Sequence, residues 1–253
     1  MPNTHRIEFP GSHGVDLAAR LDLPPGDAKA LALFAHCFTC SKESFAAARI
    51  STGLVDHGFG VLRFDFTGLG SSDGDFANTN FSSNTEDLVC AAEWLADNHG
   101  PARILIGHSL GGAAVLTVAS QLEAVDGVVT IGAPSDVTHI EALLGDAVGT
   151  IETEGEAAVE LAGRSFLIRR QFLDDLRATD LLDRVASMRR PLLVMHSPTD
   201  AQVDVSHAGR IYQAARHPKS FMALDGADHM LSSPGDAVFA SRIIAAWADR
   251  HTN

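Results

Sequence analysis

The chain has few cysteines and no long apolar run, and these two absences exclude several classes of protein. Its 253 residues include three cysteines, an odd number that argues against a disulfide framework and is typical of a reducing cytoplasm. Hydrophobic residues make up 45% of the chain, yet no apolar run approaches the length needed to cross a bilayer. Residues 1–6 lack the apolar segment of a secretory signal. The sequence therefore predicts a cytoplasmic protein with no membrane partner.

Basic residues are also scarce. The chain has 19 Lys and Arg against 32 Asp and Glu, for a net charge of -13. This balance disfavours nucleic acid and anionic membranes as partners, because both repel a negative surface. A small molecule is then the expected partner, and the composition leaves the oligomeric state open.

Short apolar runs alternate with helical stretches, and the length of 253 residues suits one domain with a large core. The predicted strands are residues 6–9, 15–21, 31–35, 60–64, 103–106, 128–131, 191–195 and 221–224. The predicted helices include residues 45–56, a stretch capped by Asn84, residues 206–215 and residues 237–250. Strands that alternate with helices indicate an α/β fold with a mostly parallel, eight-stranded sheet. Ligands should bind at the carboxyl ends of its strands.

One interval interrupts this alternation, at about residues 134–190. It is too long for an ordinary connection between a helix and a strand. Residues 156–168 alternate as a hairpin that turns at 162–164, and residues 170–188 indicate two short helices. We expect the interval to be a cap inserted over the site, and the alternative is a surface excursion with no role there.

A serine flanked by glycines lies between a predicted strand and a predicted helix, in the string Gly107-His108-Ser109-Leu110-Gly111. The pattern G-x-S-x-G places its serine on a strained turn, which requires small residues two positions away on each side. Such a turn exposes Ser109 Oγ at the carboxyl edge of the sheet. The backbone N–H of Leu110, at the start of the helix, can then face a developing oxyanion.

A serine nucleophile needs a base, and the base needs an acid that orients it. In this arrangement the acid and then the histidine follow the serine along the chain. Asp200 lies in the loop at the carboxyl end of the strand at 191–195, whereas Asp204 lies nearer the next helix and is the weaker candidate. His229 follows the strand at 221–224. The rival histidines are His36, His108 and His196.

The loop after the strand at 31–35 is expected to supply the second oxyanion donor. It contains His36-Cys37-Phe38-Thr39-Cys40-Ser41-Lys42, and the N–H of Phe38 is the candidate. The C-x-x-C spacing of Cys37 and Cys40 also allows a redox pair or half a metal site, although a zinc site of four cysteines is excluded by their number. We expect two small side chains packed beside the oxyanion hole.

A second glycine-rich loop, at residues 64–74, contains G-x-G after a strand. It lacks a third glycine, and Asp73 would repel a pyrophosphate, so it does not predict a dinucleotide site. We expect the loop to let Asp65 turn beneath the site. Neither a cofactor nor a metal ion is predicted.

With these motifs the chain resembles the α/β-hydrolase superfamily over essentially its full length. Three longer strings, residues 36–42, 62–70 and 76–81, are similar to the hydrolase half of bacterial proteins that fuse an α/β hydrolase to an OsmC-like peroxide-reducing domain. Residues 1–253 contain no OsmC-like domain. Many relatives have glycine where Cys37 stands here, and glycine has more backbone freedom.

The resemblance implies the α/β-hydrolase fold and a hydrolase that acts on esters or related acyl compounds. Its motifs assign Ser109 as nucleophile, His229 as base and Asp200 as acid, with Phe38 and Leu110 as oxyanion donors. The prediction is a serine esterase that cleaves small or medium carboxylic esters through an acyl-enzyme. Three alternatives stay open: perhydrolase or haloperoxidase chemistry on the same triad, a thiol-redox protein using the cysteine pair, and a ligand receptor without catalysis.

Overall fold

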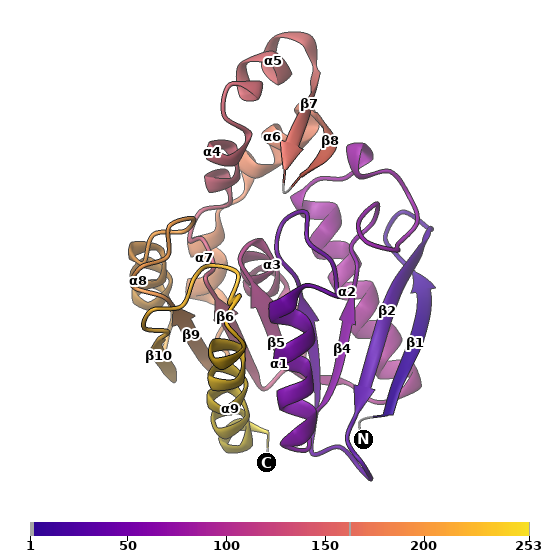
Figure 1. Cartoon of the computed structure of the whole chain (residues 1–253), viewed down its shortest axis with the longest axis vertical. Coiled ribbons are helices and arrows are strands. Elements are labelled where there is room, and N and C mark those ends of the chain that lie inside the picture. Colours follow the sequence, from indigo (N-terminus) through magenta and orange to yellow (C-terminus); the bar gives the residue numbers. More distant parts are fainter. Residues whose placement is uncertain (1–2, 162, 253) are drawn as a thin grey trace.

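An eight-stranded sheet with helices on both faces forms the body of the molecule (Figure 1). The computed structural model describes residues 3–161 and 163–252, so Met1, Pro2, Ala162 and Asn253 lie outside it. The strand order is β1-β2-β4-β3-β5-β6-β9-β10. The strands are β1 (Asn3–Pro10), β2 (Asp16–Leu23), β3 (Leu31–Ala35), β4 (Gly60–Phe64), β5 (Ala102–His108), β6 (Gly127–Ile131), β9 (Leu192–His196) and β10 (Lys219–Ala223).

Most neighbouring strands in this sheet are parallel. The β1–β2 and β2–β4 pairs are antiparallel, and the pairs from β4 across to β10 are parallel. Every residue of β3, β4, β6 and β9 is buried, as expected for strands covered on both faces. The predicted α/β fold with a mostly parallel, eight-stranded sheet is confirmed.

The helices divide the core into two layers, one on each face of the sheet. On one face α1 (Phe45–Asp56) packs against α9 (Pro234–His251), and their buried residues include Ile50, Leu54 and Ile244. The other face is covered by α2 (Phe81–Asn98), α3 (Leu110–Val118) and α8 (Ser206–Ala214). Among the described residues, no helix combines the length and apolar character that a membrane crossing requires.

The start of α2 differs from the prediction. Asn80, not Asn84, is the N-cap: its side chain accepts a hydrogen bond from the backbone N–H of Ser83, and Ser83 Oγ accepts one from the N–H of Asn80. This reciprocal capping box satisfies two N–H groups that would otherwise have no partner. Asn84 lies within the helix and is buried.

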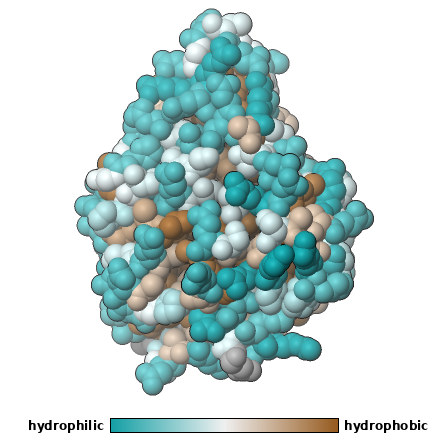
Figure 2. Space-filling model, turned by 180° about the vertical axis from the view of Figure 1, so that it is seen from behind, coloured by the Kyte–Doolittle hydropathy of each residue, from teal (hydrophilic) through white to brown (hydrophobic). Residues whose placement is uncertain are grey.

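The long interval between β6 and β9 forms a protruding segment at the carboxyl ends of the strands (Figure 1). Its outer surface, seen from behind, is mostly hydrophilic (Figure 2). The segment contains η2 (Val137–His139), α4 (Ile140–Leu144), α5 (Ala147–Glu154), β7 (Glu156–Leu161), β8 (Arg164–Arg169), α6 (Arg170–Ala178) and α7 (Leu181–Ser187). The predicted hairpin and the two following helices are confirmed, except that Ala162 of the predicted turn lies outside the described residues; η2, α4 and α5 were not predicted. That the segment acts as a cap stays a prediction.

Candidate active site

Ser109 lies on a sharp turn between β5 and α3. Its φ of 55° and ψ of -124° are strained for a residue other than glycine, at a cost on the order of 1–3 kcal/mol. The flanking glycines have no room for a side chain. A Cβ on Gly107 would lie 2.2 Å from the carbonyl oxygen of Gly111, and one on Gly111 would lie 2.3 Å from that of Ala35. The predicted strand–turn–helix geometry around Ser109 is confirmed.

The structure brings Ser109, His229 and Asp200 together in one hydrogen-bonded chain. Ser109 Oγ lies 3.0 Å from His229 Nε2, and His229 Nδ1 lies 2.7 Å from Asp200 Oδ2. The three residues follow β5, β10 and β9 at the same edge of the sheet (Figure 1). Because a carboxylate only accepts, Nδ1 carries the proton in this arrangement, and Nε2 is left to accept the proton of the Ser109 hydroxyl.

Asp200, rather than Asp204, is the carboxylate that contacts His229. The Asp200 side chain is 2% exposed, and its Oδ1 accepts hydrogen bonds from the backbone N–H groups of Gln202 and Val203, at 2.9 Å each. Burial raises the pKa of Asp200, but the hydrogen bonds from His229 and the backbone outweigh this effect and hold it below the usual value. Asp200 is therefore ionised at neutral pH. Asp204 is exposed and accepts from the N–H of Ser206.

Each of the three rival histidines donates a hydrogen bond to a backbone carbonyl group. His108 Nε2 donates to the carbonyl of His229 at 2.7 Å, and His196 Nε2 donates to that of Val203 at 2.8 Å. His36 Nδ1 donates to the carbonyl of Cys37 at 2.8 Å. Burial lowers the pKa of both His36 and His108, so these rings are neutral at pH 7. In the part of the chain described, His229 is the histidine bonded to Ser109.

The neutrality of His108 predicts a pH dependence of stability. Burial is the main cause that lowers its pKa from 6.5 to about 4. Between these values an unfolded chain binds a proton on His108 that the folded chain excludes, so acid destabilises the fold. This displacement corresponds to about 3 kcal/mol of unfolding free energy, present above pH 6.5 and lost as the pH falls to 4.

Urea unfolding at pH 7 and pH 4 measures this effect. Other buried histidines contribute to the total loss, so the comparison is between the unaltered chain and His108→Gln. Between pH 7 and pH 4, the free energy of unfolding of the variant should fall by about 3 kcal/mol less than that of the unaltered chain. Equal losses in the two proteins would contradict the assignment.

Two backbone N–H groups lie on adjoining segments beside Ser109. Leu110 begins α3, and Phe38 lies in the loop after β3. In residues 3–161 and 163–252, neither N–H has a hydrogen-bond acceptor. A Cβ on Gly111 would lie 2.4 Å from the carbonyl oxygen of His36, so the first turn of α3 directly touches the loop of Phe38. The N–H of Leu110 also carries the positive end of the helix dipole.

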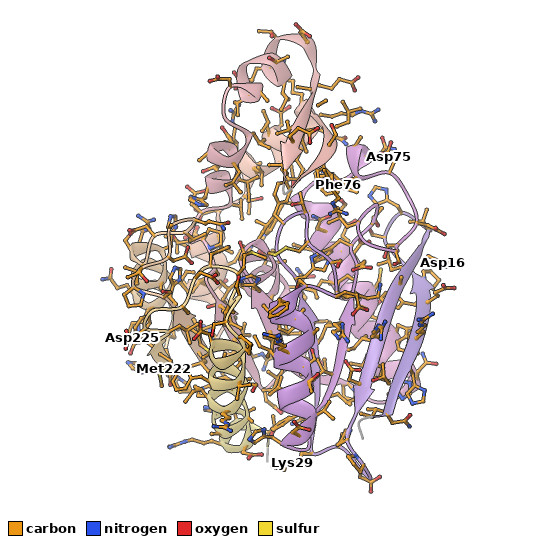
Figure 3. The ribbon with its side chains drawn as sticks, in the orientation of Figure 1. Asp16, Lys29, Asp75, Phe76, Met222 and Asp225 are labelled. Carbon is orange, nitrogen blue, oxygen red and sulfur yellow. A yellow bond between two sulfur atoms is a disulfide. The ribbon has the colours of Figure 1, made fainter. Side chains whose placement is uncertain are left out.

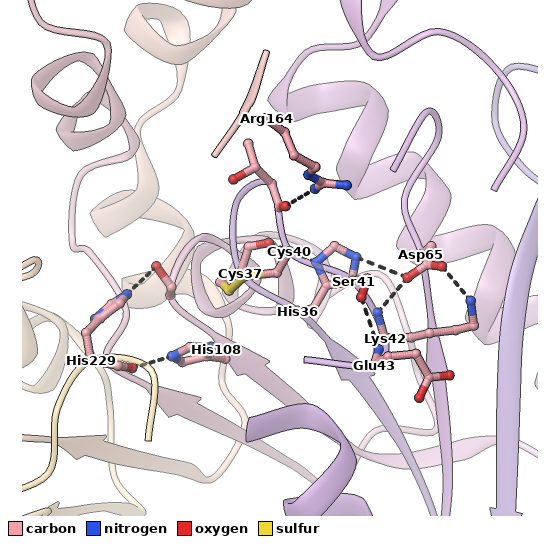
Figure 4. Close-up of a disulfide and its surroundings, with 12 residues drawn as sticks. His36, Cys37, Cys40, Ser41, Lys42, Glu43, Asp65, His108, Arg164 and His229 are labelled. Atoms are coloured by element: carbon pink, nitrogen blue, oxygen red, sulfur yellow. Dashed lines mark hydrogen bonds and ion pairs between the residues drawn. A yellow bond between two sulfur atoms is a disulfide. The ribbon is translucent and has the colours of Figure 1, made fainter. Parts of the chain in front are cut away.

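Cys37 and Cys40 form a disulfide (Figure 4). The inference from the odd number of cysteines, that the chain has no disulfide, is therefore wrong, and the two cysteines are paired as their C-x-x-C spacing allowed. The backbone between them turns back on itself, since the N–H of Cys40 donates to the carbonyl of Cys37 at 3.1 Å. This turn leaves the two Cα atoms 5.3 Å apart, within the range that a disulfide spans. Cys90 of α2 is free and half-buried, and burial raises the pKa of its thiol.

A buried ion pair lies beside the disulfide-bonded turn of this loop, as Figure 4 shows. Asp65 is fully buried and accepts hydrogen bonds from the backbone N–H and Nζ of Lys42, at 2.5 Å each, and from the N–H of Ser71 at 2.8 Å. A Cβ on Gly70 would lie 2.2 Å from Asp65 Oδ2. The glycine-rich loop therefore closes over Asp65, which bonds to Lys42 in the loop of Phe38; that Asp65 turns beneath the active site stays a prediction. The sequence analysis did not identify Lys42 as the partner of Asp65. The signal it could have used is a lysine close to a predicted buried strand, where a buried cation needs an anionic partner.

Four aromatic rings connect the loop of Phe38 to the protruding segment. Phe38 packs on Phe172 of α6 with ring centroids 5.6 Å apart, and Phe76 packs on Phe166 of β8 at 5.3 Å. Phe76 belongs to η1 (Phe76–Asn78) and lies where η1 meets the hairpin (Figure 3). Arg164 of β8 also donates from Nη2 to the carbonyl of Thr39. The protruding segment thus contacts the loop directly.

One small cavity reaches Phe38 and Leu110, but Ser109 does not line it. It measures about 10 Å³ and is also lined by apolar neighbours that include Leu69 and Phe81. A larger cavity, of about 670 Å³, lies between η2, the α6–α7 junction and α8, and Ser109 does not line it. The described residues contain no group of three or more His, Cys, Asp or Glu side chains arranged to hold a metal ion.

Residues 32–241 match the model of the alpha/beta hydrolase family, and the chain belongs to this family of hydrolases. Its structure is similar to the esterase domain of a Rhodothermus marinus protein, which is 50% identical, with a TM-score of 0.82 over 99% of this chain and 100% of that one. Est1E from Butyrivibrio proteoclasticus, with ferulic acid bound, shares the fold at 18% identity, with a TM-score of 0.83 over 97% and 98% of the two chains.

Two curated proteins are also similar in sequence. Escherichia coli O157:H7 YfhR is 23% identical over 229 residues, which cover 90% of this chain and 68% of that protein. The mouse mitochondrial palmitoyl-protein thioesterase ABHD10 is 35% identical over 102 residues, or 39% of this chain and 33% of that protein. The more specific resemblance to hydrolases fused to an OsmC-like domain stays a prediction.

Proposed function

We propose that this hydrolase cleaves carboxylic esters through a triad of Ser109, His229 and Asp200. The observation that carries the proposal is the continuous chain of hydrogen bonds, 3.0 Å from Ser109 Oγ to His229 Nε2 and 2.7 Å from His229 Nδ1 to Asp200 Oδ2. A nucleophile, a base in reach of it and an acid that orients the base are the three parts that serine acyl transfer needs. The 50% identity to an esterase domain supports the same chemistry.

The reaction proceeds through an acyl-enzyme. Ser109 Oγ attacks the ester carbonyl while His229 accepts its proton, and the ionised Asp200 stabilises the resulting imidazolium. The N–H groups of Phe38 and Leu110 donate to the oxyanion, and each donor contributes about 3 kcal/mol to transition-state stabilisation. His229 then protonates the leaving alcohol, and a water molecule activated by His229 releases the acid and restores Ser109.

The segment at about residues 134–190 acts as a cap in this proposal. Its Phe172 packs against Phe38, and its Arg164 bonds to Thr39, so it limits the space beside the oxyanion donors. Because these contacts pack the segment against the loop of Phe38, short acyl groups require the least rearrangement of it. Small or medium acyl esters are therefore the proposed substrates.

A panel of esters tests the proposal. We expect kcat/KM to be highest for aryl esters of short acids and to fall as the acyl chain lengthens, because a longer chain displaces the cap. Lactones and acyl thioesters belong in the panel, the latter because of the likeness to a thioesterase over 102 residues. Assays with hydrogen peroxide, with and without halide, separate perhydrolase and haloperoxidase chemistry.

A fluorophosphonate probe followed by peptide mass spectrometry locates the nucleophile. The expected adduct is on Ser109, because the probe reacts with serines activated by a base. No adduct, or an adduct elsewhere in the chain, together with no turnover across the panel, would refute the proposed function.

A further inference from the structure

The disulfide encloses the backbone that carries one proposed oxyanion donor. Phe38 and Thr39 are the two residues between Cys37 and Cys40. Thr39 has a φ of 58°, a conformation that β-branched residues rarely adopt and that persists only where the surroundings enforce it. The conformation of this turn therefore depends on contacts made around it.

The two ends of the loop have anchors of their own. Lys42 is held by Asp65, and its carbonyl accepts a hydrogen bond from Arg63. At the other end, His36 continues from β3 and is bonded to the carbonyl of Cys37. The Cys37 carbonyl belongs to the same planar peptide group as the N–H of Phe38, so the bond from His36 restrains that group. The anchor at Lys42 lies outside the turn between the two cysteines.

Three contacts hold the middle of the loop in the described structure. They are the disulfide, the hydrogen bond from the N–H of Cys40 to the carbonyl of Cys37, and the hydrogen bond from Arg164 to the carbonyl of Thr39. The ring of Phe38 packs on Phe172, but a side-chain contact leaves the peptide plane free to rotate. The direction of the Phe38 N–H depends on the two hydrogen bonds that the Cys37 carbonyl of the same peptide group accepts, and the disulfide keeps Cys40 in place to donate one of them.

We propose that the Cys37–Cys40 disulfide is a positioning element that directs the N–H of Phe38 at the oxyanion, and that its reduction by a dithiol reversibly slows ester turnover. This inference rests on the proposed function, because it assigns the disulfide a role in that reaction. It also accounts for a cysteine at a position where glycine would otherwise provide the turn, since the covalent link replaces conformational freedom with constraint.

The chemistry is ordinary thiol–disulfide exchange. Cys37 is 4% exposed, while Cys40 is more accessible, so the thiolate of the dithiol attacks Cys40 Sγ and Cys37 leaves as a thiolate that takes up a proton. The second thiolate of the reagent then attacks its own sulfur in the mixed disulfide and releases Cys40, which is also protonated. Two electrons pass from the dithiol to the protein, and the reagent becomes a cyclic disulfide.

The expected effect is on kcat rather than KM. An oxyanion donor acts on the transition state, so misdirecting it slows the chemical step and leaves ground-state binding unchanged. Complete loss of one donor lowers kcat by about 100-fold to 1,000-fold. A reduced turn that still samples the productive conformation keeps part of the transition-state stabilisation. We therefore expect kcat to fall by about 10-fold to 100-fold on reduction.

The experiment uses the full chain with Cys90→Ala, which removes the one thiol not involved. Hydrolysis of p-nitrophenyl acetate is measured before reduction with dithiothreitol, after it, and again after reoxidation. Titration with a chromogenic thiol reagent should show two new thiols on reduction. We expect kcat to fall, KM to stay unchanged, and kcat to recover when the thiols disappear. Two new thiols with an unchanged kcat would overturn the inference.

A double variant, Cys37→Ala with Cys40→Ala, provides the matched control. It should have the low kcat of the reduced protein and be indifferent to dithiothreitol. A double variant with the kcat of the oxidised protein would also overturn the inference. If it does not fold by circular dichroism, reduction of the Cys90→Ala protein decides alone.

Ser109→Ala in the same Cys90→Ala background separates the two proposals. If it hydrolyses the ester as fast as its parent, the proposed function fails, and the disulfide loses its assigned role with it. If the Ser109→Ala protein is inactive while the kcat of its Cys90→Ala parent does not change on reduction, the proposed function stands and only the disulfide inference fails.

Discussion

Ser109→Ala should lower kcat for p-nitrophenyl acetate by about a million-fold, the scale on which serine enzymes depend on their nucleophile. Without Oγ no acyl-enzyme forms, and the residual rate comes from the oxyanion donors and substrate binding. The fold should be unaffected, because the strained turn is set by the backbone and the flanking glycines. Steady-state kinetics at high enzyme concentration and circular dichroism measure the two effects.

Ser135→Ala is the matched control for this substitution. Ser135 is also buried beside the carboxyl end of the sheet, but its hydroxyl bonds to Arg210 and His207 and not to His229. Its replacement should leave kcat close to that of the unaltered chain. A Ser109→Ala protein that kept most of its activity would show that another group attacks the ester.

His229→Ala should have an effect of the same size, about a million-fold in kcat, since an unassisted serine hydroxyl is a weak nucleophile. Because the two residues act as a unit, the double variant with Ser109→Ala should be no slower than either single variant. Kinetic measurement of all three proteins tests this non-additivity.

His207→Ala is the control for the base. His207 lies on α8 and bonds to Ser135, and burial lowers its pKa to about 4. It is therefore neutral at the assay pH, but it does not belong to the hydrogen-bonded triad of Ser109, His229 and Asp200. It should keep nearly full activity. A large loss of kcat in His207→Ala together with a small loss in His229→Ala would show that His207, and not His229, is the base.

The sheet and the three grouped side chains could be predicted because their signals are local. An apolar run such as residues 31–35 has the length of a buried strand, and G-x-S-x-G describes a turn within one short string. Asp200 and His229 each lie in the loop that follows such a strand, and parallel strands bring their carboxyl ends to one edge. Their convergence on Ser109 therefore follows from chain order and strand direction together.

Other features depend on contacts between distant segments, which no local pattern encodes. The hydrogen bond from Arg164 to Thr39 and the pairing of Lys42 with Asp65 both join separate parts of the chain. The disulfide was not predicted for another reason. The odd number of cysteines argued against one, and the turn between Cys37 and Cys40 contains no glycine that would have indicated it in the sequence. The start of α2 at Phe81 was misplaced because Asn80 and Asn84 are both plausible caps.

The hydrogen bond between Arg164 and the carbonyl of Thr39 joins the protruding hairpin to the turn that bears Phe38. If the hairpin acts as part of a cap in the proposed reaction, a displacement of β8 that separates these two groups also removes a contact from that turn. Loops that complete a catalytic site on closing couple access to reactivity in this way. Under the proposed function, an ester would be cleaved only if it remained bound until the hairpin returned, so residence time would become a criterion of selection.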